Sequence, residues 1–380
     1  NPWDAVRYIK AGERILGEIA GRLALEIGAG AEISFFLCNV DYLRQATWGC
    51  HESFLHSCAP HLLPVQIIPH LVSRTIGTGA GGFDPFSNGI RFSLSPRSAH
   101  IDQAVSSVST TQRPIFHTKD EALGARGYHR LHIICGESLC SEWSAWLKTG
   151  TTALVLAMAE AGLHPGRGAE LRSPIAALRT IAADTGCRAT LKLSDGSSSS
   201  ALKIQRHYLA QAELHLGEPF MPVWAEKVCR RWRRVLDLLE DGDARIQTML
   251  DWPMKHALFT RHIKSRGADW ESLGCWNHVV EKLQAALKRT SRRCPLHPDF
   301  VLGFNSPVLE EVARLTPYLR AKGLKWDEWE GFLRLRQELF EIDTRFGQLG
   351  SRGVYRSLEE AGLPKHMDGV DNIEHAVFNP

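Results

Sequence analysis

The spacing of apolar residues changes near residue 200, and this change limits the chain to a mixed fold. Before that point, short runs rich in aromatic and β-branched residues are bounded by Gly, Pro, Asn or Asp, which is typical of strands. After it, apolar residues recur at helical spacing in segments 204–216, 223–239, 245–266, 279–290 and 326–345. The sequence therefore predicts an α+β protein whose second half is mainly helical.

The predicted strands all lie in the first 200 residues. Segments 32–38, 67–76 and 90–95 are short apolar runs between turn-forming residues. Segment 129–136 alternates polar and apolar positions and then becomes wholly apolar, as a strand entering a core does. Segment 190–200 contains an Asp-Gly turn signal, which predicts a hairpin.

Two helices are predicted within the same half of the chain. Residues 3–25 place apolar side chains at helical spacing among charged ones, which indicates an amphipathic helix. Residues 143–162 are densely apolar, which favours a largely buried helix that begins after Ser141. Gly162 and Pro165 are expected to end it.

The composition excludes several classes of protein. The 380 residues are 44% hydrophobic and 23% charged, with a net charge of +3, so neither a disordered chain nor a nucleic-acid binder is indicated. The nine cysteines form no CxxC pair, which favours reduced thiols. The longest apolar stretch is too short for a membrane span. We expect a cytoplasmic protein without nucleic-acid or membrane partners.

One dense basic cluster could suggest nucleic-acid binding. It is Cys229-Arg-Arg-Trp-Arg-Arg234, with an aromatic residue among the arginines. On a helix these arginines point to more than one side, so the sequence favours a solvated helix surface.

Six sequence blocks in the first 160 residues occur in an order that is characteristic of one family. The blocks are Trp48-Gly-Cys-His-Glu-Ser-Phe-Leu55; Leu71-Val-Ser-Arg-Thr75 with Gly79-Ala-Gly81; Phe92-Ser-Leu-Ser-Pro-Arg97; Arg113-Pro-Ile-Phe-His-Thr-Lys-Asp-Glu121; Arg130-Leu-His-Ile-Ile-Cys-Gly136; and Leu147-Lys-Thr-Gly-Thr-Thr-Ala-Leu-Val-Leu156. In this order they resemble the Pup ligase and Pup deamidase family, that is, proteasome accessory factor A and its depupylase relative. Segments 204–208, 251–255 and 341–346 resemble later landmarks, so the resemblance covers roughly the whole chain.

The resemblance implies a glutamine-synthetase-like fold. In such carboxylate-amine ligases a curved antiparallel sheet forms an open cradle backed by helices. Residues 1–200 are then expected to be part of the catalytic domain, with its first strands missing. Residues 201–380 are expected to be a mainly helical continuation, with a candidate insertion at 276–333 and a truncated C-terminal domain. The chain is thus interpreted as a fragment that lacks both ends of the family's fold.

The activity implied by the resemblance is the ATP- and Mg²⁺-dependent ligation of Pup. The γ-phosphate passes to the side-chain carboxylate of the C-terminal Glu of Pup, and a substrate lysine then displaces phosphate to form an isopeptide bond. The implied partners are Pup or a Pup-like modifier, lysine-bearing protein substrates and, functionally, the bacterial proteasome. Residues 99–111 and the Gly-Cys-His-Glu sequence are closer to the ligase branch.

Two other functions remain open at this stage. The first is a depupylase or deamidase, which hydrolyses the isopeptide or amide bond and is marked by an inserted loop upstream of the residues present here. The second is an inactive homologue that binds Pup or ATP without turnover. Altered residues in the Lys119-Asp-Glu-Ala122 segment motivate that second alternative.

Four residues fall where the family keeps nucleotide and phosphate contacts: His51, Arg97, Lys119 and His132. Phosphoryl transfer requires cations and hydrogen-bond donors around the phosphates, which these residue types supply. Each also has a purely structural interpretation. His132 could bond a neighbouring strand, His51 could cap a turn, and Arg97 could pair with Asp102 on the surface, where such a pair contributes about 0–1 kcal/mol.

Lys119 departs from the family, which commonly has Arg at this position. An ammonium group keeps the charge but cannot form the two-pronged hydrogen bond that a guanidinium makes to phosphate oxygens. The Pro-His that usually follows the acidic pair is also replaced, because Ala122 and Leu123 follow Glu121. The sequence therefore predicts an altered loop here.

The family's magnesium-binding Glu residues and its base, an Asp, are expected upstream of Asn1. The carboxylates of Glu52, Asp120 and Glu121 are not credible substitutes for them on sequence grounds. No residue of this sequence is therefore assigned to the metal or to the catalytic base.

We predict that residues 1–380 by themselves do not conjugate Pup. The polypeptide would be incubated with Pup, ATP, magnesium and a lysine-bearing protein, and conjugates would be sought by mass spectrometry. A covalent Pup conjugate formed by these residues alone would contradict the assignment of the metal and base residues to the upstream segment.

Overall fold

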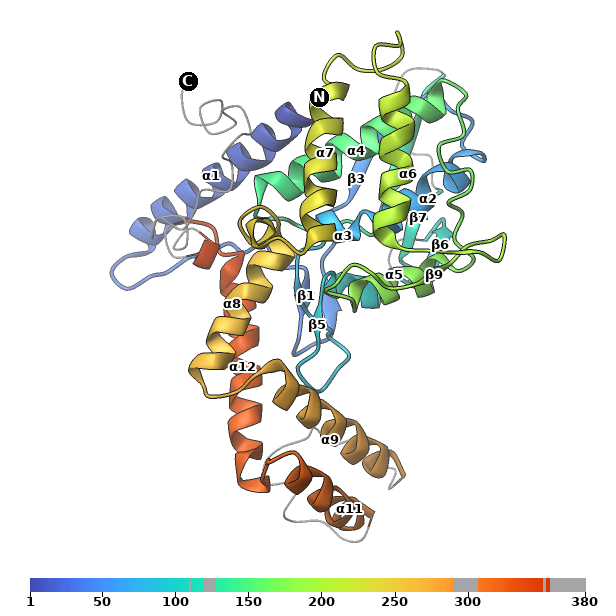
Figure 1. Ribbon diagram of the computed structural model, residues 1–380. Helices are drawn as coiled ribbons and strands as arrows, with labels where there is room; N and C mark the ends of the chain where they lie inside the picture. Colours follow the sequence, from blue (N-terminus) through green and yellow to red (C-terminus); the bar gives the residue numbers. More distant parts are fainter. Residues whose placement is uncertain (109–110, 119–126, 290–306, 351–352, 356–380) are drawn as a thin grey trace.

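The computed structural model describes residues 1–108, 111–118, 127–289, 307–350 and 353–355. Its body combines small sheets with helices, and a helical arm made of α8, α9, α11 and α12 extends away from this body (Figure 1). The predicted α+β class is confirmed. One sheet and the helices on its inner face position the candidate site.

The main sheet has four strands in the spatial order β3 (Glu52–His56), β8 (His129–Ile133), β7 (Pro114–His117) and β6 (Gln103–Ser106). The strand predicted at 129–136 is confirmed, and it occupies a central position. β8 pairs antiparallel with both of its neighbours, as predicted for the cradle.

The pairing of β6 with β7 is parallel, so the prediction of a wholly antiparallel sheet is wrong at this edge. A parallel pair requires the connecting segment to span back along the whole length of the first strand. The connection 107–113 can reach about 23 Å when extended, whereas β6 is only about 13 Å long. The chain can therefore return along β6 and start β7 in the same direction.

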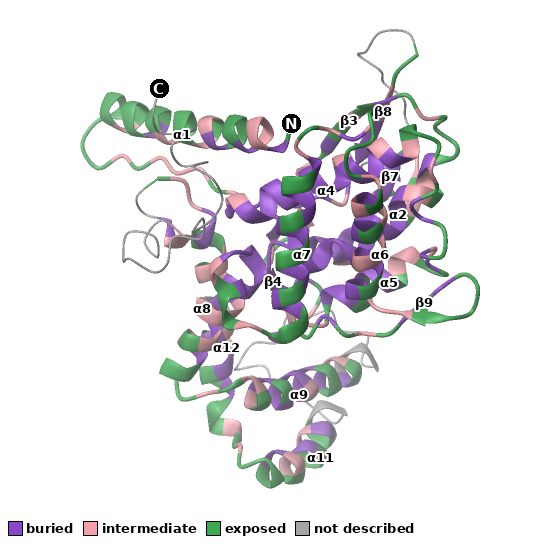
Figure 2. Ribbon diagram, turned by 45° about the horizontal axis from the view of Figure 1, so that its top comes forward, coloured by how far each residue is buried: buried purple, intermediate pink, exposed green. Residues whose placement is uncertain are grey.

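Helices cover one face of this sheet and pack in layers behind it (Figures 1 and 2). Buried residues of these helices and of the strands form one hydrophobic cluster that runs from Val6 to Trp252. The helices are α2 (Leu63–Ser73), α3 (Thr75–Thr78), α4 (Glu142–Glu160), α5 (Pro174–Ala182), α6 (Ala201–Leu214) and α7 (Ala225–Asp241). Ser141 caps α4 by accepting a hydrogen bond from the Ser144 amide, as the sequence indicated.

The prediction of a strand over residues 67–76 is wrong, because this segment forms α2 and α3. Every residue from Ile67 to Ser73 is buried. A helix buried on all sides has no polar face, so its apolar run carries no helical period and resembles a buried strand. Pro64 lies in the first turn of α2, where proline favours a helix start.

The strand predicted at 32–38 is also wrong as a member of the sheet. Phe36 forms only an isolated bridge with Gln348, directly after α12. The Leu37 amide donates to the Gly347 carbonyl at 2.7 Å, so this extended segment attaches the N-terminal part of the chain to the C-terminal end of α12, at the base of the arm.

Three short antiparallel pairs complete the strands of the described residues. The hairpin predicted at 190–200 is confirmed, and the strand predicted at 90–95 is confirmed over two residues. The pairs are β1 (Val40–Asp41) with β2 (Ala46–Thr47), β4 (Gly82–Phe83) with β5 (Phe92–Ser93), and β9 (Leu191–Lys192) with β10 (Ser198–Ser199). The 3₁₀-helix η1 (Pro96–His100) follows β5.

The predicted amphipathic helix is confirmed as α1 (Pro2–Ile27), capped by Asn1. Its start is held by an aromatic cluster in which the Trp3 and Trp146 rings meet edge to face at 5.1 Å. Arg231 of α7 lies over Trp3, Trp143 and Trp146, with 5.0 Å between its guanidinium carbon and the Trp146 ring centre. We call Arg231 with these three tryptophans the tryptophan cage.

The tryptophan cage corrects the interpretation of the basic cluster at 229–234 as a solvated surface. Arg231 is 7% exposed and takes part in the core, where aromatic faces attract its positive charge. Arg230, Arg233 and Arg234 are exposed, although Arg234 also lies 6.0 Å from the Trp143 ring centre, so this part of the cluster does face water.

The arm contains most of a second hydrophobic cluster, centred on Phe259, Trp276, Phe332 and Leu339, which Phe83 and Ile90 of the body join. It is built from α8 (Asp251–Ser265), α9 (Trp270–Arg289), α11 (Pro307–Ala321), the 3₁₀-helix η3 (Trp326–Glu328) and α12 (Trp329–Phe346), with the 3₁₀-helix η2 (Ala244–Thr248) preceding α8. At its base Lys255 donates to Asp343 at 2.8 Å, and Tyr42 donates to the same carboxylate at 2.6 Å. This buried junction attaches the arm to the body.

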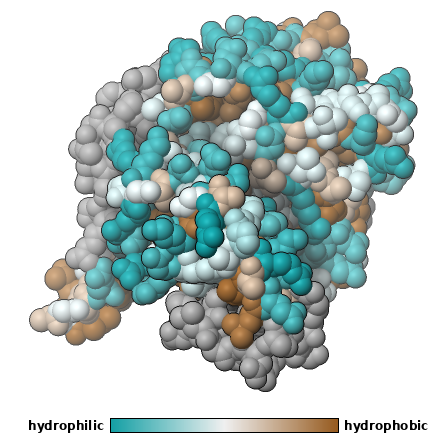
Figure 3. Space-filling view, turned by 60° about the horizontal axis from the view of Figure 1, so that its bottom comes forward, coloured by the Kyte–Doolittle hydropathy of each residue, from teal (hydrophilic) through white to brown (hydrophobic). Residues whose placement is uncertain are grey.

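The surface of the arm side is mostly hydrophilic, with apolar side chains in small separate patches (Figure 3). No helix of the described part of the chain is long and apolar enough to cross a membrane.

A buried ion pair joins the sheet to the helices. The Arg74 guanidinium donates to both oxygens of Glu52 at 2.9 and 2.5 Å, and the two side chains are 4% and 9% exposed. Arg74 also donates to the Thr152 hydroxyl and the Lys148 carbonyl of α4. One guanidinium thus connects β3, the end of α2 and the middle of α4.

We predict that Arg74→Met lowers the free energy of unfolding by about 3–5 kcal/mol, because it leaves the buried Glu52 carboxylate without its partner. The control is Arg14→Met, which removes an exposed ion pair with Glu18 on α1 and is expected to cost less than about 0.5 kcal/mol. Chemical denaturation followed by circular dichroism measures both. Equal losses in the two variants would contradict the structural role given to the pair.

His70 lies fully buried in a hydrogen-bonded network behind the sheet. The side-chain nitrogen of Gln205 can only donate a hydrogen bond, so Nδ1 of His70, 3.3 Å away, is the acceptor. The proton of the neutral ring is therefore on Nε2, which donates to the Thr152 hydroxyl at 3.2 Å. Burial, assisted by the charge of Arg74, holds the pKa of His70 well below its ordinary value.

We predict that the protein loses stability as the pH falls from 7 to 5. The unfolded chain takes up a proton at His70 below about pH 6.5, whereas the folded chain does not, so the free energy of unfolding falls by up to about 1.4 kcal/mol per pH unit. In His70→Gln this loss should shrink, while the exposed control His164→Gln should keep it. Parallel pH profiles for wild type and His70→Gln would contradict the prediction.

Candidate functional site

The face of the main sheet opposite the helices carries a group of imidazoles. In β3, Glu52, Phe54 and His56 point toward the helices, so Ser53 points to the opposite face. Register places Ser53 and His117 beside His132 of β8. This face therefore gathers polar side chains from three strands, and we call it the imidazole face.

His51 joins this group from the segment that leads into β3. Its Nδ1 lies 3.2 Å from Nε2 of His132, so one proton is shared between the two rings in a hydrogen bond. The ring centre of His132 lies 5.1 Å from that of His51 and 4.9 Å from that of His117. Three imidazoles thus form a row across the end of β3, β8 and β7.

Arg97 lies directly beneath the segment that carries His51. Its Nη1 donates to the Thr47 hydroxyl at 2.8 Å, and its Nη2 and Nε donate to the Ile134 carbonyl at 2.9 and 3.3 Å. The side chain is 2% exposed. These contacts use three of its five N–H groups and hold the guanidinium between β2 and the end of β8.

Gly49 allows Arg97 and His51 to approach each other. A Cβ atom at this position would meet Nη2 of Arg97 at 2.5 Å and Cδ2 of His51 at 2.9 Å, and both approaches are shorter than real Cβ contacts. The absence of a side chain at residue 49 is therefore required by this packing.

The electrostatics of the site follow from partial burial and nearby cations. Burial lowers the pKa of His51, and the charges of Arg97 and Arg130 lower it further. Burial also lowers the pKa of Arg97, against the opposing charge of Glu137. His51 is therefore neutral at pH 7, able to donate a hydrogen bond without adding charge, while the positive potential comes from the arginines.

The structure brings together three of the four residues selected from the sequence: His51, Arg97 and His132. Lys119 lies outside the described residues. The surface pair proposed as an alternative for Arg97 does not form, because Arg97 is buried and Asp102 pairs instead with Arg179 at 3.7 Å. The structural alternative for His132 was a hydrogen bond to a neighbouring strand. His132 does bond to His51, which lies directly before the neighbouring strand β3.

His117 and Gly49 were not selected from the sequence, although both lie in the blocks that carry the resemblance. The alternation of β7 could have identified His117, because a polar residue at a strand end points away from the core when its neighbour Phe116 points in. Gly49 carries no local signal of its role, since the close approach involves residues distant in the sequence.

Metal-binding groups are not evident in the described residues, where no set of three His, Cys, Asp or Glu side chains could hold an ion. Glu52 is committed to Arg74, on the side of the sheet away from the imidazole face. Both of its carboxylate oxygens therefore accept hydrogen bonds from Arg74.

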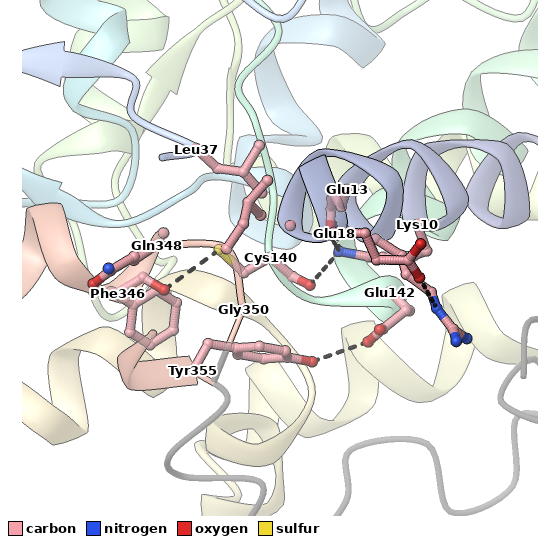
Figure 4. A pocket seen from close by; sticks show the side chains of 14 residues that line it. Lys10, Glu13, Glu18, Leu37, Cys140, Glu142, Phe346, Gln348, Gly350 and Tyr355 are labelled. Atoms are coloured by element: carbon pink, nitrogen blue, oxygen red, sulfur yellow. Dashed lines mark hydrogen bonds and ion pairs between the residues drawn. The ribbon is translucent and has the colours of Figure 1, made fainter. Parts of the chain in front are cut away.

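A cavity of about 380 Å³ lies elsewhere, between α1, the start of α4 and the residues after α12 (Figure 4). Its charged side chains bind one another: Lys10 donates to Glu13 and to the Cys140 carbonyl, and Tyr355 donates to Glu142. Because its buried cation is already bound by protein oxygens, this cavity suits an anionic ligand less well than the imidazole face does.

Comparison with known proteins identifies close relatives. The family model described as Pup-ligase protein matches residues 1–284. The chain is 39% identical over 269 residues to Pup–protein ligase 1 of Rhodococcus erythropolis, covering 69% of this chain and 59% of that protein. It is 39% identical over 264 residues to the Pup–protein ligase of Nocardia farcinica, covering 68% and 58%. The chain thus spans less than two thirds of the length of these relatives.

Two solved structures resemble the whole described fold. A structure of the Pup ligase PafA in complex with ADP aligns with a TM-score of 0.69 and 25% identity, covering 99% of this chain and 71% of that one. A complex between Pup and its ligase PafA aligns with a TM-score of 0.65 and 26% identity, covering 98% and 65%.

We predict that Gly49→Ala lowers the free energy of unfolding by about 1–3 kcal/mol, because the added methyl group overlaps a guanidinium that is held on two sides. Gly12→Ala on α1 is the control, since no atom lies within 4 Å of the added Cβ and alanine favours helix. Denaturation curves measure both. A Gly49→Ala variant as stable as wild type would show that the Arg97 packing is loose.

Proposed function

The chain belongs to the Pup-ligase family, and we propose that the protein joins the side-chain carboxylate of the C-terminal Glu of Pup to lysines of other proteins, using ATP. The observation that carries this proposal is its 39% identity, over 269 residues, to proteins named Pup–protein ligase. The ADP complex and the Pup complex of similar folds support a nucleotide and Pup as ligands.

The imidazole face supplies chemistry that phosphate groups require. The His51–His132 hydrogen bond uses the N–H group of one ring, so the other ring of the pair keeps its N–H group free to donate to an anionic oxygen. Arg97 lies beneath them and adds positive potential at short range in a partly water-excluded setting, where such charges act more strongly than in water. We therefore propose this face as the phosphate-binding part of the nucleotide site, with Lys119 as a further contact.

In the proposed reaction the terminal phosphoryl group of ATP passes to the Glu side-chain carboxylate of Pup and gives a glutamyl phosphate. A lysine amine then attacks the activated carbonyl, and phosphate leaves as the isopeptide bond forms. The residues of this chain would hold the nucleotide phosphates in place and offset their negative charge as it moves. Mg²⁺ is proposed only as the usual counter-ion of ATP, and no described residue is assigned to it.

The test of this proposal uses the protein expressed from its complete reading frame. It should form a covalent Pup conjugate on a lysine-bearing protein and release ADP only when ATP is present, as followed by mass spectrometry and nucleotide analysis. Release of free protein from a Pup conjugate without new conjugation would identify a depupylase instead. Binding of ATP and Pup with neither product would identify an inactive homologue.

We predict that His51→Gln and His132→Gln each weaken ADP binding by about tenfold, because either change disrupts the pair that directs one N–H group toward an anionic oxygen. Exposed His164→Gln is the matched control and should bind ADP as wild type does. Isothermal titration calorimetry measures the dissociation constants. Unchanged ADP binding in both site variants would remove the imidazole face from the nucleotide site.

A further inference from the structure

Glu137 lies in the loop between β8 and α4, where the sheet, η1 and the glycine turn at 79–82 meet. Its side chain is 3% exposed. One carboxylate oxygen accepts the Arg97 amide at 3.0 Å, and the other accepts the Ala80 amide at 2.8 Å. A single buried carboxylate therefore fixes two backbone segments that are distant in the sequence.

The backbone of Glu137 is held as firmly as its side chain. Its carbonyl accepts from the Lys148 ammonium of α4 at 2.9 Å. The residue before it, Gly136, packs so closely that a Cβ there would meet the Cys50 carbonyl at 2.4 Å. The backbone of Glu137 is therefore held in one position, from which its carboxylate reaches the amides of Arg97 and Ala80 at the same time.

The contacts of Arg97 extend from this carboxylate to the imidazole face. Glu137 holds the Arg97 backbone from behind, and the Arg97 guanidinium holds Thr47 and the Ile134 carbonyl from beneath. Gly49 packs against that guanidinium and against the His51 ring, and the charge of Arg97 lowers the pKa of His51. A shift of the Arg97 backbone would therefore move the surface on which His51 lies.

We infer that Glu137 is a positioning residue for the nucleotide site, acting through Arg97. The inference rests on the proposed function, because the imidazole face is its premise. Glu137 itself reaches no ligand, since it is buried beneath η1 and the glycine turn. Its role requires two oxygen acceptors, which a carboxylate offers and a carboxamide does not: in Gln one oxygen is replaced by a donor that would face an amide N–H.

The experiment measures ADP binding by isothermal titration calorimetry for four variants of the full chain: Glu137→Gln, Arg97→Lys, the two combined, and Glu160→Gln. Glu160 is the matched control because its carboxylate also accepts a backbone amide, that of Ser57 at 2.7 Å, away from the imidazole face. We expect about tenfold weaker binding in Glu137→Gln and unchanged binding in Glu160→Gln.

The combined variant separates positioning from a general loss of structure. If Glu137 acts through Arg97, Glu137→Gln adds no further loss once Arg97→Lys is present, whereas unrelated structural damage would add to it. Additive losses would therefore overturn the inference. If Glu137→Gln does not fold, Glu137→Asp, which keeps the charge but shortens the reach, takes its place with the same expected non-additivity.

The results also separate this inference from the proposed function. Wild type that binds no ADP would overturn the nucleotide site and, with it, the positioning role. Wild type that binds ADP, together with a folded Glu137→Gln variant of equal affinity, would overturn the positioning role alone.

Discussion

The ion pair between Glu52 and Arg74 is the interaction on which the arrangement of the sheet and helices depends. A charge this far from water is tolerated only when its partner and hydrogen bonds are in place, so the pair forms only if β3, α2 and α4 are all correctly assembled. It also divides the two faces of β3. Glu52 turns inward to Arg74, and its neighbours His51 and Ser53 are thereby turned outward, onto the imidazole face.

Local patterns in the sequence predicted the elements whose residues face two different environments. The β8 sequence alternates polar and apolar residues and α1 has a buried and an exposed side, and both elements were located correctly. From Ile67 to Ser73 every residue of α2 lies in the core, so this part of its sequence has no polar side to reveal a helical period. The spacing of apolar residues changes near residue 200, but the first hydrophobic cluster continues into α6 and α7, because packing follows tertiary contacts and not the local type of structure.

The sequence predicted those site residues that lie in motifs of the family, but it did not predict the residues whose role depends on tertiary packing. His51, Arg97 and His132 came from blocks that resemble a family, and the structure places them together. That Arg97 is buried beneath the site, instead of lying on its surface, depends on Thr47 and on the Ile134 carbonyl. Glu137 gave no signal, since an acidic residue after a strand is most often solvated, and only the fold brings two amides to it.

The tryptophan cage has a consequence for how the protein can be observed. Trp3 is carried by α1, while Trp143, Trp146 and Arg231 belong to α4 and α7, so the surroundings of the Trp3 indole report whether α1 is docked. A nearby cation and an edge-to-face ring change the emission of an indole from its value in water. Among the eleven tryptophans of the chain, Trp3 therefore has an emission that responds to the attachment of the first helix, without any added label.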